Sequence, residues 1–473
     1  MTMAAALAIL HAALFLAFLV HALLRDDLNS TSRIAWVLAL LLLPIAGPIF
    51  YYLYGQIRFG GKEGAAHRAA EAATRDIVLS SGDGSGIGEL GAAAQFARAI
   101  NGFGVTRGNR AELLDSPDAQ RARLIADIDQ ARAFVHVFYY IWLDDETGRS
   151  VADALIRAAR RGVKVRAGVD QIGSHAFLKS RTWKSLGDAG IDLMVALPIG
   201  NPIAMIFARR PDLRNHRKIS VIDGRICHCG SQNCADAAFS PKPLYAPWED
   251  VMVRLDGPVA RQMDLLFAQC WFECHPLDLR PWDYETPPFD GGMPAQVVGT
   301  GPTTGKGVTA QLISRIVGEA RKQILLTTPY FVPGDVVAEA IAGAARAGVD
   351  VTLVVPARND SGFVGPASRA YYGPLLRAGV KIMEFRGGLL HAKIITVDED
   401  LVFFGSTNLD FRSFDLNFEN DILLRDPQFA AAMQARQRDY CLSAEQVTAA
   451  DVRAWPAYRR IWCNALATIG PLI

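Results

Sequence analysis

The stretch HRKISVIDGRICHCGSQN, residues 216–233, decides the fold because a near copy, HAKIITVDEDLVFFGSTN, follows at residues 391–408. Both copies contain His-x-Lys-x4-Asp followed by Gly-Ser-x-Asn. One such motif would occur by chance in roughly one chain in a hundred of this size, so a single copy is weak evidence. Two copies with the same continuation are a strong signal. Two ordinary strand histidines are therefore the weaker interpretation.

The two copies lie on a longer internal repeat. AARRGVKV at 158–165 matches AARAGVDV at 344–351, and helical and strand patterns alternate around both. This alternation predicts an α/β fold in which helices cover a β-sheet, and the repetition predicts two pseudo-symmetric lobes that share a cleft. We expect four segments: a membrane anchor at 1–60, a linker at 61–105, a first lobe at 106–288 and a second lobe at 289–473. Within the linker, the polar residues 63–90 are typical of a linker or a loose helix.

The N-terminus carries two long apolar runs. Residues 4–24 contain no formal charge and are long enough to cross a bilayer, and 34–54 form a second run. Pro44 and Pro48 interrupt the second run, so a kinked or re-entrant segment is an alternative to a full span. Both runs are apolar on all faces, unlike helices of a soluble domain. Basic residues that follow them predict that the remainder of the chain lies in the cytoplasm.

The composition excludes one class of partner. The chain has 49 Lys and Arg against 48 Asp and Glu, a net charge of +1, whereas a protein that wraps nucleic acid needs a basic excess. Cys227, His228 and Cys229 are neighbours on a predicted strand. Their side chains therefore alternate between its faces, which argues against a zinc site.

The motif residues suit a phosphate ester. Strand alternation puts His216 and Lys218 on one face, and His391 and Lys393 share a face in the same way. A lysine can hold anionic oxygens while the imidazole reacts or transfers a proton. We expect Asp223 and Asp398 to stabilise the turns that follow these strands. Uncharged donors to the same anion are expected from Ser231, Asn233, Ser406 and Asn408.

At these residues the chain resembles the phospholipase D superfamily, whose mark is the doubled His-x-Lys-x4-Asp. The resemblance covers roughly residues 110–425. TSRIAWVLALLLLPIAGPIFYYLYG at 31–55, WEDVMVRLDGPVA at 248–260 and SFDLNFEND at 413–421 are similar to bacterial cardiolipin synthases. The resemblance implies two phospholipase D-like lobes, each a mixed β-sheet flanked by helices, preceded by two transmembrane helices. It also implies a multi-pass protein of the bacterial cytoplasmic membrane.

The resemblance implies a mechanism without metal or other cofactor. His216 would attack the phosphodiester and His391 would act as acid and base, although sequence symmetry leaves these roles open. Asp223 and Asp398 complete the two catalytic motifs, and phosphate would be bound by Lys218, Lys393, Asn233 and Asn408. An acidic partner is expected downstream of each histidine to orient its ring. Asp250 lies 34 residues after His216 and Glu419 lies 28 after His391, with Glu249 an alternative to Asp250.

The activity implied is that of a cardiolipin synthase. Such an enzyme transfers a phosphatidyl group from one phosphatidylglycerol to another and releases glycerol through a phosphohistidine. The alternatives are a phospholipase D that uses water, or a phosphatidyltransferase with another donor or acceptor alcohol. A membrane-bound nuclease is disfavoured by the near-neutral charge, and a non-catalytic scaffold is disfavoured by the two complete motifs.

Overall fold

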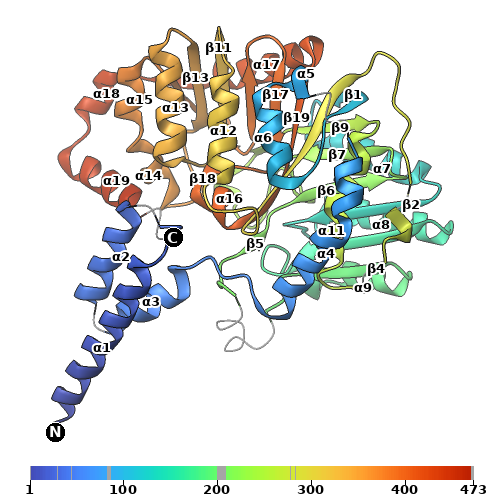
Figure 1. The fold of residues 1–473 in the computed structure, drawn as a ribbon. Coiled ribbons are helices and arrows are strands. Elements are labelled where there is room, and N and C mark those ends of the chain that lie inside the picture. The colour runs from blue at the N-terminus through green and yellow to red at the C-terminus, as the bar shows by residue number, and fades with distance from the viewer. Residues whose placement is uncertain are drawn as a thin grey trace.

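The computed structural model describes residues 2–28, 30–43, 45–82, 87–199, 209–276, 278–282 and 284–469. Three N-terminal helices project from one corner of a larger α/β body (Figure 1). They are α1 (Met3–Leu23), α2 (Ser30–Leu42) and α3 (Ala46–Tyr54).

The body contains two similar series of strands and helices. The first series of strands is β1 (Thr106–Leu113), β2 (Phe134–Tyr139), β3 (Lys164–Asp170), β4 (Asp192–Ala196), β5 (Arg214–Asn215), β6 (Lys218–Ile222), β7 (Ile226–Gly230), β8 (Trp248–Glu249) and β9 (Met252–Asp256). The second is β10 (Met293–Thr300), β11 (Gln323–Thr327), β12 (Phe331–Val332), β13 (Asp350–Pro356), β14 (Lys381–Phe385), β15 (Leu389–Leu390), β16 (Ile394–Val397), β17 (Leu401–Gly405), β18 (Leu409–Asp410), β19 (Asn417–Arg425) and β20 (Ala444–Val447). The helices are α4 (Gly61–Ser80), α5 (Ile87–Leu90), α6 (Ala92–Asn101), α7 (Pro117–Gln130), α8 (Glu146–Arg160), α9 (Arg181–Asp188), α11 (Val259–Trp271), α12 (Val308–Gly318), α13 (Gly334–Arg346), α14 (Val364–Arg369), α15 (Tyr372–Ala378), α16 (Phe411–Asp415), α17 (Pro427–Leu442), α18 (Ala449–Ala454) and α19 (Ala457–Ile469).

One mixed sheet of 16 strands runs through the body. Its order is β20-β14-β13-β11-β16-β17-β19-β10-β1-β9-β7-β6-β2-β3-β4, with β5 beside β19. Outward from the central β1–β10 pair, β9-β7-β6-β2-β3-β4 corresponds to β19-β17-β16-β11-β13-β14. In both series the outer three strands are parallel, and the motif strand, β6 or β16, is antiparallel to its neighbour. The predicted mixed sheet with flanking helices is confirmed.

Helices cover both faces of the sheet because their apolar residues recur at helical spacing. In α8, Val151, Leu155 and Ala158 are buried and pack with β2 and β3. Leu155 is fully buried, and its burial stabilises the fold by about 1.5–3 kcal/mol. Apolar residues of α11 and α17 join strands of both series in one core, which includes Cys227 and Cys229. These cysteines pack among apolar side chains.

Residues 61–105, expected to be a linker, form α4, α5 and α6, and residues 83–86 lie outside the described residues. His67 of α4 is buried, and its Nδ1 lies 2.7 Å from a carboxylate oxygen of Glu273, just beyond α11. Burial opposes protonation, but Glu273 and Glu71 raise the pKa of His67 to about 9. The imidazolium and these carboxylates attach α4 to the body at neutral pH.

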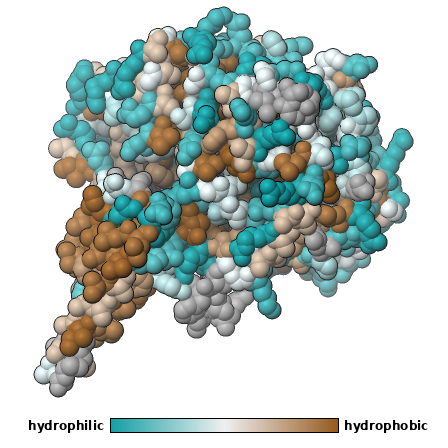
Figure 2. Space-filling model, viewed as in Figure 1, coloured by the Kyte–Doolittle hydropathy of each residue, from teal (hydrophilic) through white to brown (hydrophobic). Residues whose placement is uncertain are grey.

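The second apolar run is divided between two short helices. α2 ends at Leu42 and α3 begins at Ala46, and Pro44 between them lies outside the described residues. At 1.5 Å per residue the 13 residues of α2 extend for about 20 Å, less than a hydrocarbon core of about 30 Å. Within the described ranges, no helix combines the length and the apolar character needed to span a membrane. The three helices nevertheless present a continuous apolar surface (Figure 2).

Candidate active site

The two sequence motifs meet where the two series of strands join. His216 directly follows β5, and His391 directly follows β15. Each histidine is held by the backbone of the opposite series: His216 N–H donates to Phe418 O at 2.9 Å, and His391 N–H donates to Glu249 O at 2.8 Å. The short parallel pairs β5–β19 and β15–β8 fix these contacts. Both histidines are therefore positioned by the interface between the repeats.

Each imidazole pairs with a carboxylate of the other repeat. His216 Nδ1 lies 2.8 Å from Glu419 Oε2, and His391 Nδ1 lies 2.6 Å from Asp250 Oδ1. The order of residues along the chain does not reveal this exchange, because Asp250 follows His216 and Glu419 follows His391. Pairing within each repeat is wrong, and the acids are crossed. Glu249 contributes its backbone carbonyl, while Asp250 provides the carboxylate.

The carboxylates set the tautomer of both rings. A carboxylate can only accept a hydrogen bond, so Nδ1 of each histidine carries a proton and Nε2 retains a lone pair. Burial lowers the pKa of His216 to about 4 and also lowers that of His391. Burial raises the pKa of Glu419 and Asp250, but the adjacent histidines and lysines outweigh this and hold both below the usual range. At neutral pH the pairs are neutral imidazoles beside ionised carboxylates.

Two buried lysines accompany the histidines. Lys218 Nζ donates to His216 O and Lys393 Nζ donates to His391 O, each at 2.6 Å. An ammonium has three protons, so each lysine retains donors for an anion. Burial lowers the pKa of Lys218 to about 7 and that of Lys393 to about 8. The site thus combines two Nε2 lone pairs with two cations, an arrangement suited to a phosphodiester.

Comparison with known proteins agrees with this geometry. The family model described as cardiolipin synthase, PLD-like domain matches residues 124–271 and 313–439, once in each repeat. The chain belongs to the cardiolipin synthase family. A phospholipase D-nuclease N-terminal model matches residues 13–56. The sequence-based assignment to cardiolipin synthases of the phospholipase D superfamily, and hence to an enzyme family of lipid metabolism, is confirmed.

Similar proteins from this family match nearly the whole chain. Cardiolipin synthase A of Klebsiella pneumoniae is 35% identical over 458 residues, which covers 93% of each chain. Cardiolipin synthase A of Erwinia tasmaniensis is 36% identical over 449 residues and covers 91% of this chain and 90% of its own. A crystal structure of phosphatidylserine synthase from Haemophilus influenzae has a TM-score of 0.58 and 15% identity, covering 77% of this chain and 95% of that one. It shares the fold.

The serines of the two Gly-Ser-x-Asn segments support the acids. Ser231 Oγ donates to Asp250 at 2.6 Å, and Ser406 Oγ donates to Glu419. Both serine hydroxyls thus donate to carboxylates here, and phosphate binding by Ser231 and Ser406 stays a prediction. Each Gly-Ser-x-Asn segment therefore contributes a serine that donates a hydrogen bond to the acid of its own repeat. That acid pairs with the histidine of the other repeat.

The asparagines of these segments also make local contacts. Asn233 Oδ1 accepts from Ile141 N–H at 3.2 Å, and Asn408 Nδ2 donates to Ser413 Oγ at 3.2 Å. Within the part of the chain that the structure describes, the buried Asn408 Oδ1 has no hydrogen-bond partner. Phosphate binding by Asn233 and Asn408 stays a prediction.

The motif aspartates lie at the far end of the motif strands. Asp223 accepts from the backbone N–H groups of residues 132–134, where β2 begins. Asp398 accepts in the same way from residues 321–323, where β11 begins. On β2, Phe134 is at the opposite end from Tyr139, the partner of Lys218. Asp223 and Asp398 therefore anchor the strands, in keeping with the turn interpretation, and a direct catalytic role for them stays a prediction that these contacts do not support.

Two aromatic residues that are not part of the motif pattern lie against the histidine rings. The Tyr140 ring lies 4.9 Å from the His216 ring, and Lys218 Nζ lies 5.5 Å from the centre of Tyr140. Trp248 lies 4.6 Å from the His391 ring. Tyr140 directly follows β2, and Trp248 is two residues before Asp250. These positions are the only sequence signals that could have found them.

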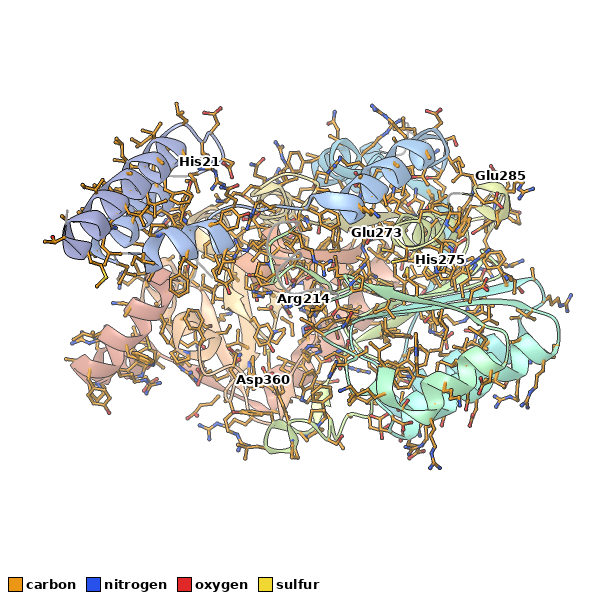
Figure 3. All side chains as sticks on the ribbon, turned by 90° about the horizontal axis from the view of Figure 1, so that it is seen from below. His21, Arg214, Glu273, His275, Glu285 and Asp360 are labelled. Carbon is orange, nitrogen blue, oxygen red and sulfur yellow. The ribbon has the colours of Figure 1, made fainter. Side chains whose placement is uncertain are left out.

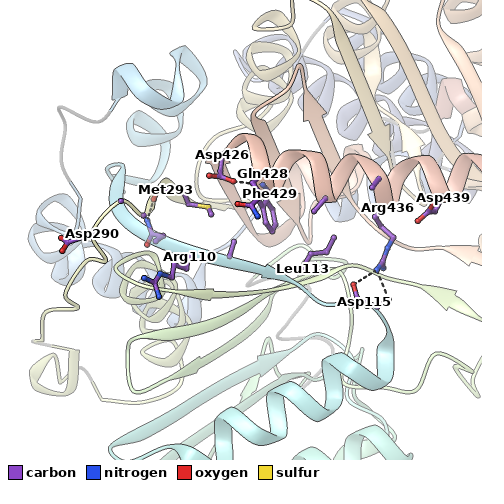
Figure 4. A pocket seen from close by; sticks show the side chains of 16 residues that line it. Arg110, Leu113, Asp115, Asp290, Met293, Asp426, Gln428, Phe429, Arg436 and Asp439 are labelled. Carbon is purple, nitrogen blue, oxygen red and sulfur yellow. Dashed lines mark hydrogen bonds and ion pairs between the residues drawn. The ribbon is translucent and has the colours of Figure 1, made fainter.

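A large groove lies elsewhere on the surface (Figure 4). Its volume is about 780 Å³, and its wall is formed by parts of β1 and α17 together with residues 290–293. None of the described motif residues lines this groove. A smaller hollow is lined by Asn233, Trp248 and Asp250 and adjoins the His391 pair.

Proposed function

We propose that this member of the cardiolipin synthase family transfers a phosphatidyl group from one phosphatidylglycerol to another and releases glycerol. The observation that carries the proposal is the crossed His-carboxylate pairs, with two buried lysines beside them. In the first step His216 Nε2 attacks phosphorus and the bond from phosphorus to the glycerol oxygen breaks. His391, which takes up a proton at Nε2 when the anionic phosphate binds beside it, gives that proton to the glycerol oxygen. The product is a phosphatidyl-His216 intermediate.

The second step reverses the proton movement. His391 takes the proton from a hydroxyl of the second phosphatidylglycerol, whose oxygen attacks phosphorus. The bond from phosphorus to His216 Nε2 breaks, and cardiolipin is released. Burial lowers the pKa of His216 to about 4, so its ring is neutral at physiological pH and can act as a nucleophile. The choice of His216 over His391 follows from the family resemblance. Lys218, Lys393, Asn233 and Asn408 would hold the phosphate oxygens, and the scheme requires no metal or cofactor.

Purified full-length chain mixed with phosphatidylglycerol vesicles should form cardiolipin and glycerol in equal amounts. Added glycerol should reverse the reaction, because the phosphohistidine is open to attack by either alcohol. Lipid products are resolved by mass spectrometry, and glycerol is assayed enzymatically. Phosphatidic acid as the sole product would instead establish a phospholipase D, and a product that needs another donor or alcohol would establish a different phosphatidyltransferase.

The N-terminal helices are proposed to attach the chain to the bacterial cytoplasmic membrane, with the catalytic body on the cytoplasmic side. Leu16 of α1 is 59% exposed and Leu42 of α2 is 69% exposed. Large apolar side chains left in water mark a surface that another apolar phase covers. The division into an anchor at 1–60, a connecting segment at 61–105 and lobes at 106–288 and 289–473 is part of this proposal. The matching strand orders on either side of β1 and β10 support it.

Changing Leu16 and Leu42 to Gln should release the chain from vesicles, because two large apolar groups would no longer favour the lipid phase. Flotation with phosphatidylglycerol vesicles in a density gradient measures this. A matched Leu244→Gln variant, which changes a 70% exposed leucine outside these helices, should float like the parent chain. Equal flotation of all three proteins would refute attachment through this surface.

The activity should fall as pH rises through about 7–8. Lys218 and Lys393 bind phosphate only when protonated, and their pKa values are about 7 and about 8. Above this range the free enzyme loses two positive charges, so kcat/KM for phosphatidylglycerol should decrease. Bound phosphate stabilises the ammonium forms, and kcat at saturating lipid should therefore decline at a higher pH. A kcat/KM that is constant up to about pH 9 would contradict the lysine assignment.

A further inference from the structure

The C-terminal helix α19 carries apolar side chains on two different parts of its surface. Leu466 is buried and packs in one cluster with Ala367 of α14, against which α19 lies. In contrast, Tyr458, Ile461 and Trp462 are 75%, 69% and 57% exposed. Their i, i+3, i+4 spacing places these three residues on one stripe of the helix. The fold therefore buries one apolar surface of α19 and leaves this exposed stripe in water, an arrangement that marks a contact surface.

Three arginines lie on or next to this helix. Arg459 and Arg460 belong to α19, and Arg453 belongs to α18, which precedes it. In the part of the chain that the structure describes, none of the three forms an ion pair, and Arg459 lies over the ring of Trp455, 4.2 Å from its centre. Exposed tyrosine and tryptophan together with arginine are typical of helices that lie in the headgroup region of a membrane.

Two carboxylates on neighbouring elements enter the charge balance. Asp451 accepts hydrogen bonds from the backbone N–H and the hydroxyl of Thr448, where α18 begins. Glu384 pairs at 3.0 Å with Arg369 of α14, the helix that packs against α19. Residues 449–469 contain the three arginines and Asp451 as their charged groups, which gives a net charge of +2. This excess favours an anionic surface, such as a bilayer of phosphatidylglycerol, over a neutral one.

The position of α19 agrees with a membrane contact. It lies at the corner of the body from which α1–α3 project (Figure 1). In the view from below, α1, marked by His21, and α19 lie at the same end of the molecule (Figure 3). The catalytic site is close: burial lowers the pKa of Lys393, and Asp360, which lies just before α14, is one of the carboxylates that oppose this. α14, on which α19 rests, therefore starts near the site.

We propose that the exposed stripe of α19 is a second membrane contact, in which Tyr458, Ile461 and Trp462 enter the headgroup region of an anionic bilayer. The inference rests on the proposed attachment through α1–α3 and not on the reaction. One attachment alone leaves the body free to turn, whereas a second contact fixes which face of the body is directed at the lipid. Three side chains bind only weakly, so α19 adds to the attachment by α1–α3 and does not replace it.

Trp462 can report this contact directly, without any need for activity. The full-length chain is bound to phosphatidylglycerol vesicles whose lipids carry bromine on acyl carbons near the headgroup, because bromine quenches an indole that it touches. The difference in fluorescence between the parent and Trp462→Phe isolates Trp462, and this difference should be quenched. Quenching should weaken when phosphatidylcholine replaces phosphatidylglycerol. The matched control is Trp183→Phe on α9, whose difference from the parent should not be quenched.

A second variant tests what the contact does. Ile461→Gln combined with Trp462→Gln should lower kcat/KM on vesicles by about 10-fold, as expected when a large apolar side chain no longer enters lipid. With phosphatidylglycerol in detergent micelles, where no bilayer orients the body, kcat/KM should be equal for parent and variant. Thermal melting should also be equal, because these side chains lie outside the buried clusters.

The possible failures are distinguishable. If the parent floats with the vesicles and Trp462 is not quenched, the α19 contact is wrong, while attachment through α1–α3 stands. If the parent does not float, the attachment fails and this inference fails with it. If Trp462 is shielded from bromine and the double variant loses self-association in detergent, the stripe is a contact between two copies of the chain, which overturns the lipid contact. Quenching without formation of cardiolipin would refute only the proposed reaction.

Discussion

His216→Ala and His391→Ala should each lower cardiolipin formation by about 10³-fold or more, because each removes a group that bonds to the substrate or moves its proton. The measurement is turnover of purified variants on phosphatidylglycerol vesicles. His275→Ala is the matched control, since His275 stacks on Trp271 outside the site. If either site variant retains the parent turnover, the two-histidine mechanism is wrong.

An activated donor distinguishes the two roles. Phosphatidyl-p-nitrophenol has a leaving group that needs no protonation, so formation of the phosphohistidine should require His216 and not His391. His391→Ala should retain the initial burst of nitrophenol, and His216→Ala should lose it. Mapping the trapped adduct to His216 provides an independent check. The reverse pattern would assign the nucleophile to His391.

Glu419→Gln should reduce turnover by about 10²–10⁴-fold, although it removes no group that touches the substrate. Glu419 holds the proton on Nδ1 of His216 and stabilises positive charge on the ring, and an amide can present a donor to Nδ1 instead. Asp250→Asn should have a similar effect through His391. The pairing itself is tested with the activated donor: Glu419→Gln should slow the nitrophenol burst, whereas Asp250→Asn should leave it nearly unchanged.

The control for this pair is internal, because both substitutions replace a buried carboxylate by its amide. Circular dichroism and thermal melting establish that both variants are folded. If Asp250→Asn slows the burst and Glu419→Gln does not, while His216 remains the nucleophile, the acids pair within each repeat and the crossed arrangement is refuted.

The sequence predicted what depends on local periodicity. Helix and strand alternation and the repeated AAR-x-GV-x-V segments were sufficient for an α/β fold with a doubled motif. His216, Lys218, His391 and Lys393 were recognisable because the same residue types recur at the same spacing. Asp250 and Glu419 were also named, because the family resemblance implies an acid downstream of each histidine.

What the sequence could not supply depends on contacts between distant segments. The exchange of Asp250 and Glu419 follows from pairing β5 with β19 and β15 with β8, and no periodicity encodes pairing between repeats. Ser231 and Ser406 have hydroxyls that suit a phosphate or a carboxylate equally, and only the fold reveals the nearer acceptor. The sequence also left undecided whether residues 34–54 form one helix or two. A proline indicates that a helix is interrupted, but it does not specify the direction of the chain that follows.

Because the carboxylates are exchanged, each repeat needs the other in order to function. A duplicated segment is ordinarily free to accumulate changes once its twin performs the task. Here each repeat contains a histidine whose tautomer is set by a carboxylate of the other repeat. A change at Glu419 therefore alters the chemistry of His216, 203 positions earlier. A chain cut near residue 288 would yield two fragments that are each inactive, and activity would return only when they associate. Duplication in this protein therefore produced mutual dependence in place of redundancy.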